Sequence, residues 1–452
     1  MKRNKIMLAF LMVMSVLMLQ SCYKDDEKVF DKNSANRMEE YLENAKSVIT
    51  SGDATWLMEM YPHGDIIYGG YSYTLKFDKE SVSVRSELQG YNKEATSLWK
   101  MTNNDGPCIS FDTYNPILHY LSTPSSSSYE AYGGEFEWVV MDVKQDVIRL
   151  RGKKTGNTVM MYRMKEDPAE YLKKVAAIDA AMIFTGLRYK SEEGTINGVI
   201  DSDNRQVTFT NTKDNDEVVN VPYCVTQDGI TFYEEVEVMG KKIKDLKLVL
   251  SAAGDPVSMD EKTSGLSFDA VFPDGWRPYD SYAGDYTIYY YRTTAGYNTI
   301  DVTLEPAGDG ASYFLKGLNP NYFYKMSYKK ATGTLQLCTQ LALSSPTENY
   351  VAANGNYVGL VSWAAAQGYI SYSATVGMNF VWDGNEEGPM TLVPSDNGVW
   401  GTYKVSSYTS YYFKSTTMSS TYRVSMSGST DDYIKGTYSH YQFPYPEYMI
   451  KK

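Results

Sequence analysis

The sequence predicts a mostly β protein with two helices, made of barrel or sandwich modules in two to three domains. Short segments of alternating apolar and polar residues, separated by turn-forming residues, recur from about residue 53 to the end of the chain. Only two segments have the three- and four-residue spacing of an amphipathic helix. With 452 residues the chain is also too long for one ordinary domain.

The first 21 residues have the parts of a secretory signal. Lys2, Arg3 and Lys5 form a basic start, and residues 6–19 are an almost unbroken apolar run. This run is shorter than the roughly 20 residues that cross a bilayer, and no later run matches its length and apolarity. We therefore expect residues 1–21 to be removed as a signal peptide.

The residues at the expected cut are Leu19-Gln20-Ser21-Cys22, which resemble the lipobox of bacterial lipoproteins. The resemblance implies a diacylglyceryl group on the sulfur of Cys22 and a further acyl chain on its amino group. More than one acyl chain gives stable anchoring in a membrane. Gln20 departs from the usual small residue of the motif. The alternative is an ordinary signal peptide followed by a chance cysteine.

An acidic cluster in the sequence Tyr-Lys-Asp-Asp-Glu-Lys, residues 23–28, follows the cysteine directly. It resembles the surface-export signal of Bacteroidetes-type lipoproteins, which implies an outer-membrane protein that faces the cell exterior. The alternative is a solvated tether, which is what charged runs usually are. Under both interpretations we expect residues 22–30 to be a lipidated tether.

Composition restricts the partners and the chemistry. Removal of three basic residues with the signal takes the formal net charge from −12 to about −15, which argues against a nucleic-acid partner. The remaining cysteines are too few and too far apart for a disulfide framework, so we expect buried free thiols. The histidines lack the close spacing of a zinc site, and we expect no metal and no cofactor. These residues are Cys108, Cys224, Cys338, His63, His119 and His440.

Residues 31–165 are expected to form a helix followed by a β-barrel or sandwich. Met38, Leu42, Ala45 and Ile49 share one face of a helix over residues 31–51, and the period then changes to two. The expected strands include a hairpin and a second series of three. They lie at residues 71–77, 82–85, 135–141, 147–151 and 158–163.

Residues 166–272 are expected to repeat the arrangement of one helix followed by strands. Asp167 can cap the helix, Pro168 suits its first position, and Glu170 complements its dipole. Tyr171 and Val175 begin an apolar stripe that continues with Ile178 and Met182 and predicts core packing. Strands are expected at residues 198–200, 206–210, 230–233 and 246–250. The repeated arrangement suggests a duplication.

Residues 273–452 are expected to be all β. Turn-forming residues cluster at 272–278 and predict a linker. The many short strands beyond it predict a sandwich or an up-and-down, lipocalin-like barrel. Expected strands are residues 285–291, 300–304, 334–338, 378–382 and 399–405.

Several stretches in the first third of the mature chain resemble an uncharacterised family of Bacteroidetes outer-membrane lipoproteins found beside SusC/SusD-like uptake systems. The resemblance implies that such uptake proteins are partners, and it implies no catalytic residues. The stretches are residues 53–62, 68–71, 75–78, 110–119 and 133–138.

Four residues are candidates for catalysis. Glu135 and Glu137 lie two apart on an expected strand and so share a face, as paired carboxylates for glycoside hydrolysis would. Asp112 and His119 could form an acid–base pair. The alternatives are plain solvent-facing glutamates and an Asp and His that stabilise an irregular loop. Asp201 and Asp203 begin like a calcium loop, but Gln206 replaces its glycine and the match then fails.

Binding is the function that the sequence favours. The 41 tyrosines supply rings with an apolar face and a polar tip, which suit sugar rings or peptide side chains and also suit half-buried strands. The densest segments, residues 282–291, 322–328 and 408–412, are candidates for a binding platform, with at least half of their rings expected in the core. Candidate ligand contacts are Tyr289, Tyr291, Tyr324 and Trp382. We expect a surface lipoprotein that captures a nutrient, glycan or peptide for an uptake complex. The alternatives are a carboxylate-based hydrolase and an adhesive or structural surface protein.

Overall fold

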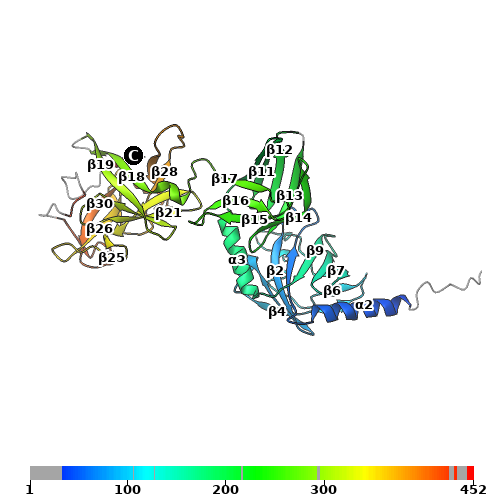
Figure 1. Cartoon of the computed structure of the whole chain (residues 1–452). Helices are drawn as coiled ribbons and strands as arrows, with labels where there is room; N and C mark the ends of the chain where they lie inside the picture. Colours follow the sequence, from blue (N-terminus) through cyan, green and yellow to red (C-terminus); the bar gives the residue numbers. More distant parts are fainter. Residues whose placement is uncertain are drawn as a thin grey trace, which may run out of the picture. The chain divides into compact units, whose positions relative to one another are not determined.

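The computed structural model describes residues 33–104, 106–126, 128–214, 217–292, 296–426, 432–434 and 445–452 (Figure 1). The signal, Cys22, the tether and His440 therefore lie outside the described residues. The described part is mostly β and contains two α-helices, which confirms the predicted fold class. It divides into two compact units: Tyr71–Ala169 with the described residues up to Ile66, and Ile67–Gly70 with Glu170–Lys452. The expected domain boundaries after residues 165 and 272 stay predictions.

The first unit begins with the predicted helix, α2 (Ser34–Ile49), whose N-terminus is capped by the side chain of Asn33. Its Ala45 and Ile49 are buried. Nine antiparallel strands follow in the order β4-β3-β2-β1-β9-β8-β7-β6-β5. They are β1 (Thr55–Met60), β2 (Tyr71–Phe77), β3 (Ser81–Ser86), β4 (Ala95–Leu98), β5 (Lys100–Thr102), β6 (Cys108–Ser110), β7 (Glu137–Val143), β8 (Val147–Gly152) and β9 (Thr158–Arg163). Two 3₁₀ turns, η2 (Glu87–Gln89) and η3 (Tyr120–Ser122), lie between them.

This sheet curls but is not a closed barrel. Its edge strands β4 and β5 are neighbours in the chain, separated by Trp99 alone. Trp99 is buried and donates from Nε1 to the carbonyl oxygen of Asp78. Its ring lies edge-on to Phe77, with centroids 4.8 Å apart. The concave core is therefore filled by large rings, among them Trp56 and Trp138, both fully buried.

The second unit begins with the other predicted helix, α3 (Pro168–Ala181), and the Asp167 side chain caps it by accepting from Ala169 N. Its buried residues are Tyr171, Leu172 and Val175. Eight strands then form a closed antiparallel barrel, in which the first and last strands pair. They are β10 (Gly186–Ser191), β11 (Gly194–Asp201), β12 (Gln206–Asn211), β13 (Val218–Val225), β14 (Gly229–Val238), β15 (Lys241–Leu250), β16 (Pro256–Glu261) and β17 (Ser267–Val271).

A second closed barrel follows the 3₁₀ turn η4 (Tyr279–Tyr282) in the same unit. In this barrel β28 pairs with β22, from which it is far apart in the chain, and with β29 (Figure 1). The barrel closes where the last strand, β32, pairs with β18. Its strands are β18 (Gly284–Arg292), β19 (Gly296–Pro306), β20 (Ser312–Lys316), β21 (Tyr324–Lys329), β22 (Thr334–Cys338), β28 (Gly377–Trp382), β29 (Thr391–Asp396) and β32 (Tyr445–Lys451).

Two small sheets are built from the connections of this barrel. One contains β23, β26, β30 and β31, with β27 paired to β26; the other pairs β24 with β25. Their buried residues, such as Leu360 and Tyr408, belong to the same apolar core as the barrel interior. These strands are β23 (Gln340–Leu341), β24 (Leu343–Ser345), β25 (Glu348–Asn349), β26 (Tyr357–Ala364), β27 (Tyr369–Ser371), β30 (Ser407–Phe413) and β31 (Arg423–Val424).

One predicted strand is wrong, and another is shifted by two residues. Residues 399–405 form turns and irregular backbone, because Gly398 and Gly401 both take positive φ, which breaks an extended run. The strand predicted at 135–141 begins two residues later, at Glu137. Glu135 therefore precedes the strand, and the shared face predicted for the two glutamates does not exist.

Candidate functional site

The two glutamates have separate structural surroundings. Glu135 is buried, and its carboxylate accepts hydrogen bonds from the backbone N–H groups of Lys154 at 3.0 Å and Thr155 at 2.5 Å. Glu137 is half-buried and forms an ion pair with Lys153, with an N–O distance of 3.0 Å. Glu135 thus holds the turn between β8 and β9. A carboxylate whose oxygens are occupied by backbone amides is poorly placed for acid–base chemistry.

Asp112 and His119 also make separate contacts. The Asp112 carboxylate pairs with Lys100 at 2.8 Å. His119 is buried, and its Nδ1 accepts from the backbone N–H of Asn115 at 3.1 Å. Burial lowers the pKa of His119, so that its ring is neutral, and the second nitrogen, Nε2, has no hydrogen-bond partner among the described residues. The ring packs on Phe136, with centroids 4.8 Å apart. These contacts stabilise an irregular loop.

Neither a metal site nor a calcium loop is formed by the residues that the structure describes. No group of three or more His, Cys, Asp or Glu side chains there is arranged to hold a metal ion. Asp201 instead accepts from the backbone and side-chain nitrogens of Asn204, at 3.1 and 2.8 Å, inside the turn between β11 and β12. These hydrogen bonds lower the pKa of the Asp201 carboxyl. Asp201 therefore serves the turn.

Most tyrosines of the dense segments are in the core. Tyr324, a predicted ligand contact, is fully buried, so it cannot meet a ligand from solvent. The cause is strand alternation, which turns it into the barrel together with its neighbour Met326. Core tyrosines of these segments are Tyr282, Tyr286, Tyr290, Tyr322, Tyr324, Tyr328, Tyr408 and Tyr412.

Tyr289 and Tyr291, by contrast, point outward from β18, because the alternate residues Ile288 and Tyr290 fill the barrel. Each meets a further tyrosine on a neighbouring strand. Tyr289 stacks on Tyr448 of β32, with ring centroids 4.7 Å apart and planes at 27°. Tyr291 meets Tyr297 of β19 edge-on at 5.3 Å. We call these four residues, Tyr289, Tyr291, Tyr297 and Tyr448, the tyrosine face.

The tyrosine face is accessible and has polar groups on the same side of the sheet. Tyr297 is 76% exposed, and Tyr291 and Tyr448 are 37% and 38% exposed. Further along β18 and β19, Thr287 donates to Asp301 at 2.9 Å, and Lys452 pairs with Asp301 at 2.9 Å. The outer side of these three strands therefore combines flat aromatic rings with hydrogen-bonding groups.

The sequence identified half of this face. Tyr297 could have been found from the hairpin, because β18 and β19 follow each other in the chain and pair Tyr291 with Tyr297. Tyr448 could not have been found, since its pairing with β18 depends on closure of the barrel by the last strand.

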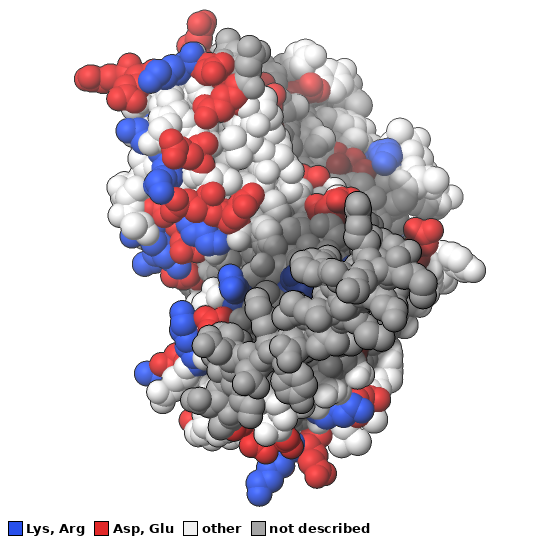
Figure 2. Space-filling view, turned by 90° about the vertical axis from the view of Figure 1, so that its right-hand side faces the viewer, with Lys and Arg blue, Asp and Glu red and all other residues white. Residues whose placement is uncertain are grey.

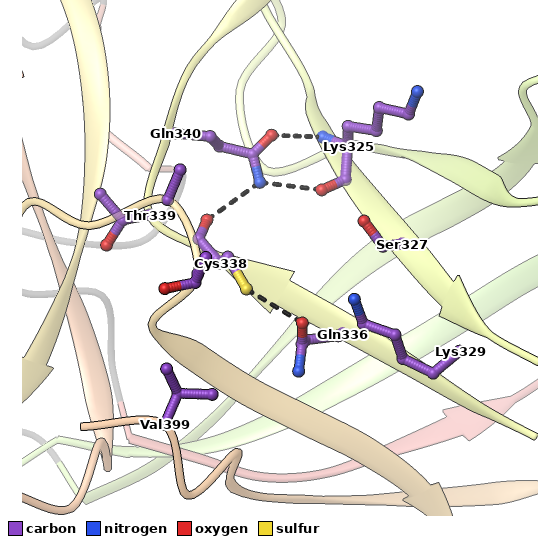
Figure 3. Close-up of a pocket in the computed structure, with 10 residues that line it drawn as sticks. Lys325, Ser327, Lys329, Gln336, Cys338, Thr339, Gln340 and Val399 are labelled. Carbon is purple, nitrogen blue, oxygen red and sulfur yellow. Dashed lines mark hydrogen bonds between the residues drawn. The ribbon is translucent and has the colours of Figure 1, made fainter. Parts of the chain in front are cut away.

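A hollow of about 420 Å³ lies on the outer side of β21 and β22 (Figure 3). Gln340 bridges its wall: its side chain accepts from Lys325 N at 2.7 Å and donates to the Lys325 and Cys338 carbonyl oxygens at 2.8 and 3.0 Å. Burial raises the pKa of the Cys338 thiol to about 11, so that it is protonated at neutral pH. The thiol is therefore a poor nucleophile.

A second hollow, of about 410 Å³, contains the remaining predicted contact, Trp382. Its other lining residues include Arg277, Lys451, Glu386 and Met390. Trp382 is 9% exposed because the Arg277 guanidinium covers its ring, with Cζ 3.3 Å from the ring centroid. Trp382 is thus a wall of this hollow and does not belong to the tyrosine face.

The face in Figure 2 carries interspersed acidic and basic side chains, in keeping with the net charge of −12. Neither helix of the described residues is long and apolar enough to cross a membrane.

Two family models match this chain. Residues 26–249 match the model described as "Domain of unknown function (DUF4302)", and residues 259–409 match DUF4987, described as a domain of unknown function. These matches agree with the expected uncharacterised family and assign no activity. No curated protein matches the chain.

Two solved structures resemble the chain weakly. The β chain of DNA polymerase III from Streptococcus pneumoniae TIGR4 is 10% identical, covers 80% of this chain and 94% of its own, and gives a TM-score of 0.10. The β subunit of the DNA polymerase of Streptococcus pyogenes is 10% identical, with 78% and 95% covered and a TM-score of 0.10. Likeness at this level carries no argument about fold or function.

Proposed function

We propose that this protein is a surface lipoprotein that binds a glycan through the tyrosine face, as the capture component of an outer-membrane uptake complex with SusC/SusD-like proteins. The lipid on Cys22 would hold it at the membrane. The observation that supports binding is the set of four outward tyrosines on the β18–β19 hairpin and on β32, which barrel closure pairs with β18.

The tyrosine face fits a saccharide for physical reasons. Exposed aromatic rings give flat apolar surfaces against which the C–H groups of a sugar ring can pack, while the phenol groups bond its hydroxyls. The rings are held by pairing across strands, so little side-chain freedom is lost when a ligand binds. Rotation of Tyr289 is further restricted by its stacking on Tyr448.

The hydrolase alternative has less support. Glu135 is occupied by backbone amides, and Asp112 and Glu137 pair with lysines. No other observation on the described residues supports a hydrolase.

Glycan and peptide arrays with the soluble chain from Lys24 onward test the proposal, followed by calorimetry on each hit. The double variant Tyr289→Ala/Tyr448→Ala should weaken glycan binding about tenfold or more, as expected from the loss of two stacking rings. The matched control is Tyr369→Ala/Tyr403→Ala, which removes another ring pair, exposed at Tyr369 and half-buried at Tyr403, with centroids 5.0 Å apart, from the same half of the chain.

Equal losses in both double variants would contradict the proposal, as would binding of peptides alone. Formation of product from a bound glycan would contradict the capture role and support the hydrolase alternative. If the chain binds nothing on either array, a protein partner is favoured, and pull-down from intact outer membranes would identify it.

A further inference from the structure

The hollow beside Trp382 lies at one end of the C-terminal barrel. Its walls come from five places: the β17–η4 connection, η4, the end of β28, the β28–β29 connection and the end of β32. They supply two cations, Arg277 and Lys451, and one carboxylate, Glu386. A volume of about 410 Å³ is within the range of small-molecule sites.

Arg277 is held rigidly and yet has no acceptor. Its carbonyl oxygen accepts from Tyr328 OH at 2.8 Å, and the preceding residue, Trp276, donates to Lys330 O at 2.9 Å. The guanidinium lies on the ring of Trp382. None of its N–H groups donates to a described residue, and Nε is buried without a partner. A buried unsatisfied donor of this kind is rare in folded proteins and requires an explanation.

Lys451 is the second cation without a carboxylate partner among the described residues. Its Nζ donates to Ser281 O at 2.7 Å, and it lies 5.9 Å from the ring centroid of Tyr286. Burial lowers the pKa of Lys451. Glu386 is exposed and forms no ion pair with either cation in the described part of the chain.

The charges in the hollow indicate the ligand. Two cations and one carboxylate leave a net charge of one positive unit, which matches a monoanion better than a phosphate dianion. The planar fork of a guanidinium pairs with a carboxylate through two parallel hydrogen bonds. Asn385 adds a polar wall, and Trp382 and Met390 add apolar walls. A sugar-like ring suits this combination, because its hydroxyl groups need hydrogen-bond partners and its C–H groups need apolar contacts.

We propose that this hollow binds a small organic carboxylate of monosaccharide size, with Arg277 and Lys451 holding the carboxylate and Trp382 keeping the guanidinium in place. The site uses none of the four residues of the tyrosine face, so either proposal can fail without the other.

Calorimetric titration of the soluble chain from Lys24 onward, at low ionic strength, tests the proposal with four probes: D-galacturonate, D-galactose, acetate and inorganic phosphate. We expect galacturonate to bind and galactose, which has the same ring without the charge, not to bind. Acetate should bind more weakly than galacturonate because it lacks the ring. Binding of galacturonate should weaken as the pH rises through the lowered pKa of Lys451.

Three variants complete the test. Arg277→Lys keeps the charge but loses the fork, and should weaken galacturonate binding about tenfold or more. Arg423→Lys is the matched control, since Arg423 also lies over a ring, that of Tyr411, with Cζ 4.8 Å from its centroid, and is outside the hollow. Glu386→Gln removes a repelling charge from an exposed connection and should tighten binding. It keeps the test decisive if Arg277→Lys does not fold.

The proposal is overturned if galacturonate does not bind the parent chain, or if phosphate or acetate binds as tightly as galacturonate. It is also overturned if Arg277→Lys and Arg423→Lys weaken binding equally, or if Glu386→Gln leaves the affinity unchanged. Loss of galacturonate binding in Tyr289→Ala/Tyr448→Ala with Arg277 intact would assign the ligand to the tyrosine face.

Discussion

Single carboxylates and a single histidine show how local surroundings decide the role of a residue. Glu135 and Glu137 are two positions apart, but one accepts backbone hydrogen bonds in the interior and the other pairs with a surface lysine. The sequence shows only the spacing of the two residues. Their different roles arise because the backbone N–H groups of Lys154 and Thr155 donate to Glu135 and not to Glu137. His119, likewise, is neutral because it is buried.

Replacing Glu135 should affect stability more than replacing Glu137. Glu135→Gln loses the charge and places an N–H donor beside the amide of Lys154, which should cost about 1–3 kcal/mol of unfolding free energy. Glu137→Gln breaks only an exposed ion pair and should cost less than about 1 kcal/mol. Urea unfolding measures both. Similar costs, or loss of glycan binding with unchanged stability in Glu135→Gln, would contradict the structural role.

Acidification should destabilise the first unit through His119. Its pKa in the folded state is lower than the unfolded value of 6.5, so the unfolded chain binds the proton more readily. The contribution of neutral His119 to the free energy of unfolding is therefore fully present above pH 6.5 and is lost as the pH falls through the lower pKa of the folded state. His119→Asn can still accept from Asn115 N and does not titrate. Urea unfolding of parent and variant between pH 7.5 and 5 should show a steeper loss in the parent; parallel curves would refute this.

At the scale of elements, the helices and most strands follow from local patterns. The stripe of α2 and the Asp167 cap of α3 are properties of neighbouring residues, so both helices could be predicted. The local patterns do not show how an element packs against the rest of its unit. The end of α2 is held by Arg163 from β9, which donates to the carbonyl oxygens of Ser51 at 2.9 Å and Val48 at 3.0 Å. The same guanidinium lies 4.2 Å from the ring centroid of Trp56.

Removing this guanidinium should loosen α2. Arg163→Met removes the charged donor from the carbonyl oxygens of Val48 and Ser51, which keep only the neutral donors of Ser51 and Ala54, and should cost about 1.5–3 kcal/mol. Hydrogen exchange should become faster at residues 46–49 and change little in β8. The control is Arg85→Met, which breaks only the surface pair with Glu94, with an N–O distance of 2.8 Å. Unchanged exchange in α2 would show that the helix does not depend on Arg163.

At the scale of the whole molecule, closure of the C-terminal barrel creates the candidate sites. Pairing of β32 with β18 places Tyr448 on Tyr289, and it also brings Lys451 to the hollow of Arg277 and Trp382. In the sequence, Tyr448 and Lys451 are separated from Tyr289 and Arg277 by most of the C-terminal domain. Anchoring is also a property of the whole molecule, because the lipid expected on Cys22 would determine where every binding surface acts.

Substitution of Cys22 should release the protein from the membrane. Cys22→Ala cannot accept the diacylglyceryl group, and we expect the chain in the soluble fraction, without the mass of the acyl chains. Cys108→Ala, which removes a buried free thiol, should stay with the membrane and keep the lipid mass. Fractionation of intact cells and mass spectrometry measure both. A membrane-bound Cys22→Ala would contradict the lipobox interpretation.

The sequence by itself determined the mostly β class, the two helices and the hairpins, because periodicity and turn residues act over a few positions. It did not determine that Glu135 is buried, that residues 399–405 are not a strand, or that Tyr324 is core. Only the tertiary structure decided which strands far apart in the chain are neighbours, and with them the stacking partner of Tyr289 and the residues around Arg277. The physical reason is that barrel closure pairs strands far apart in the chain, and no local pattern records that pairing.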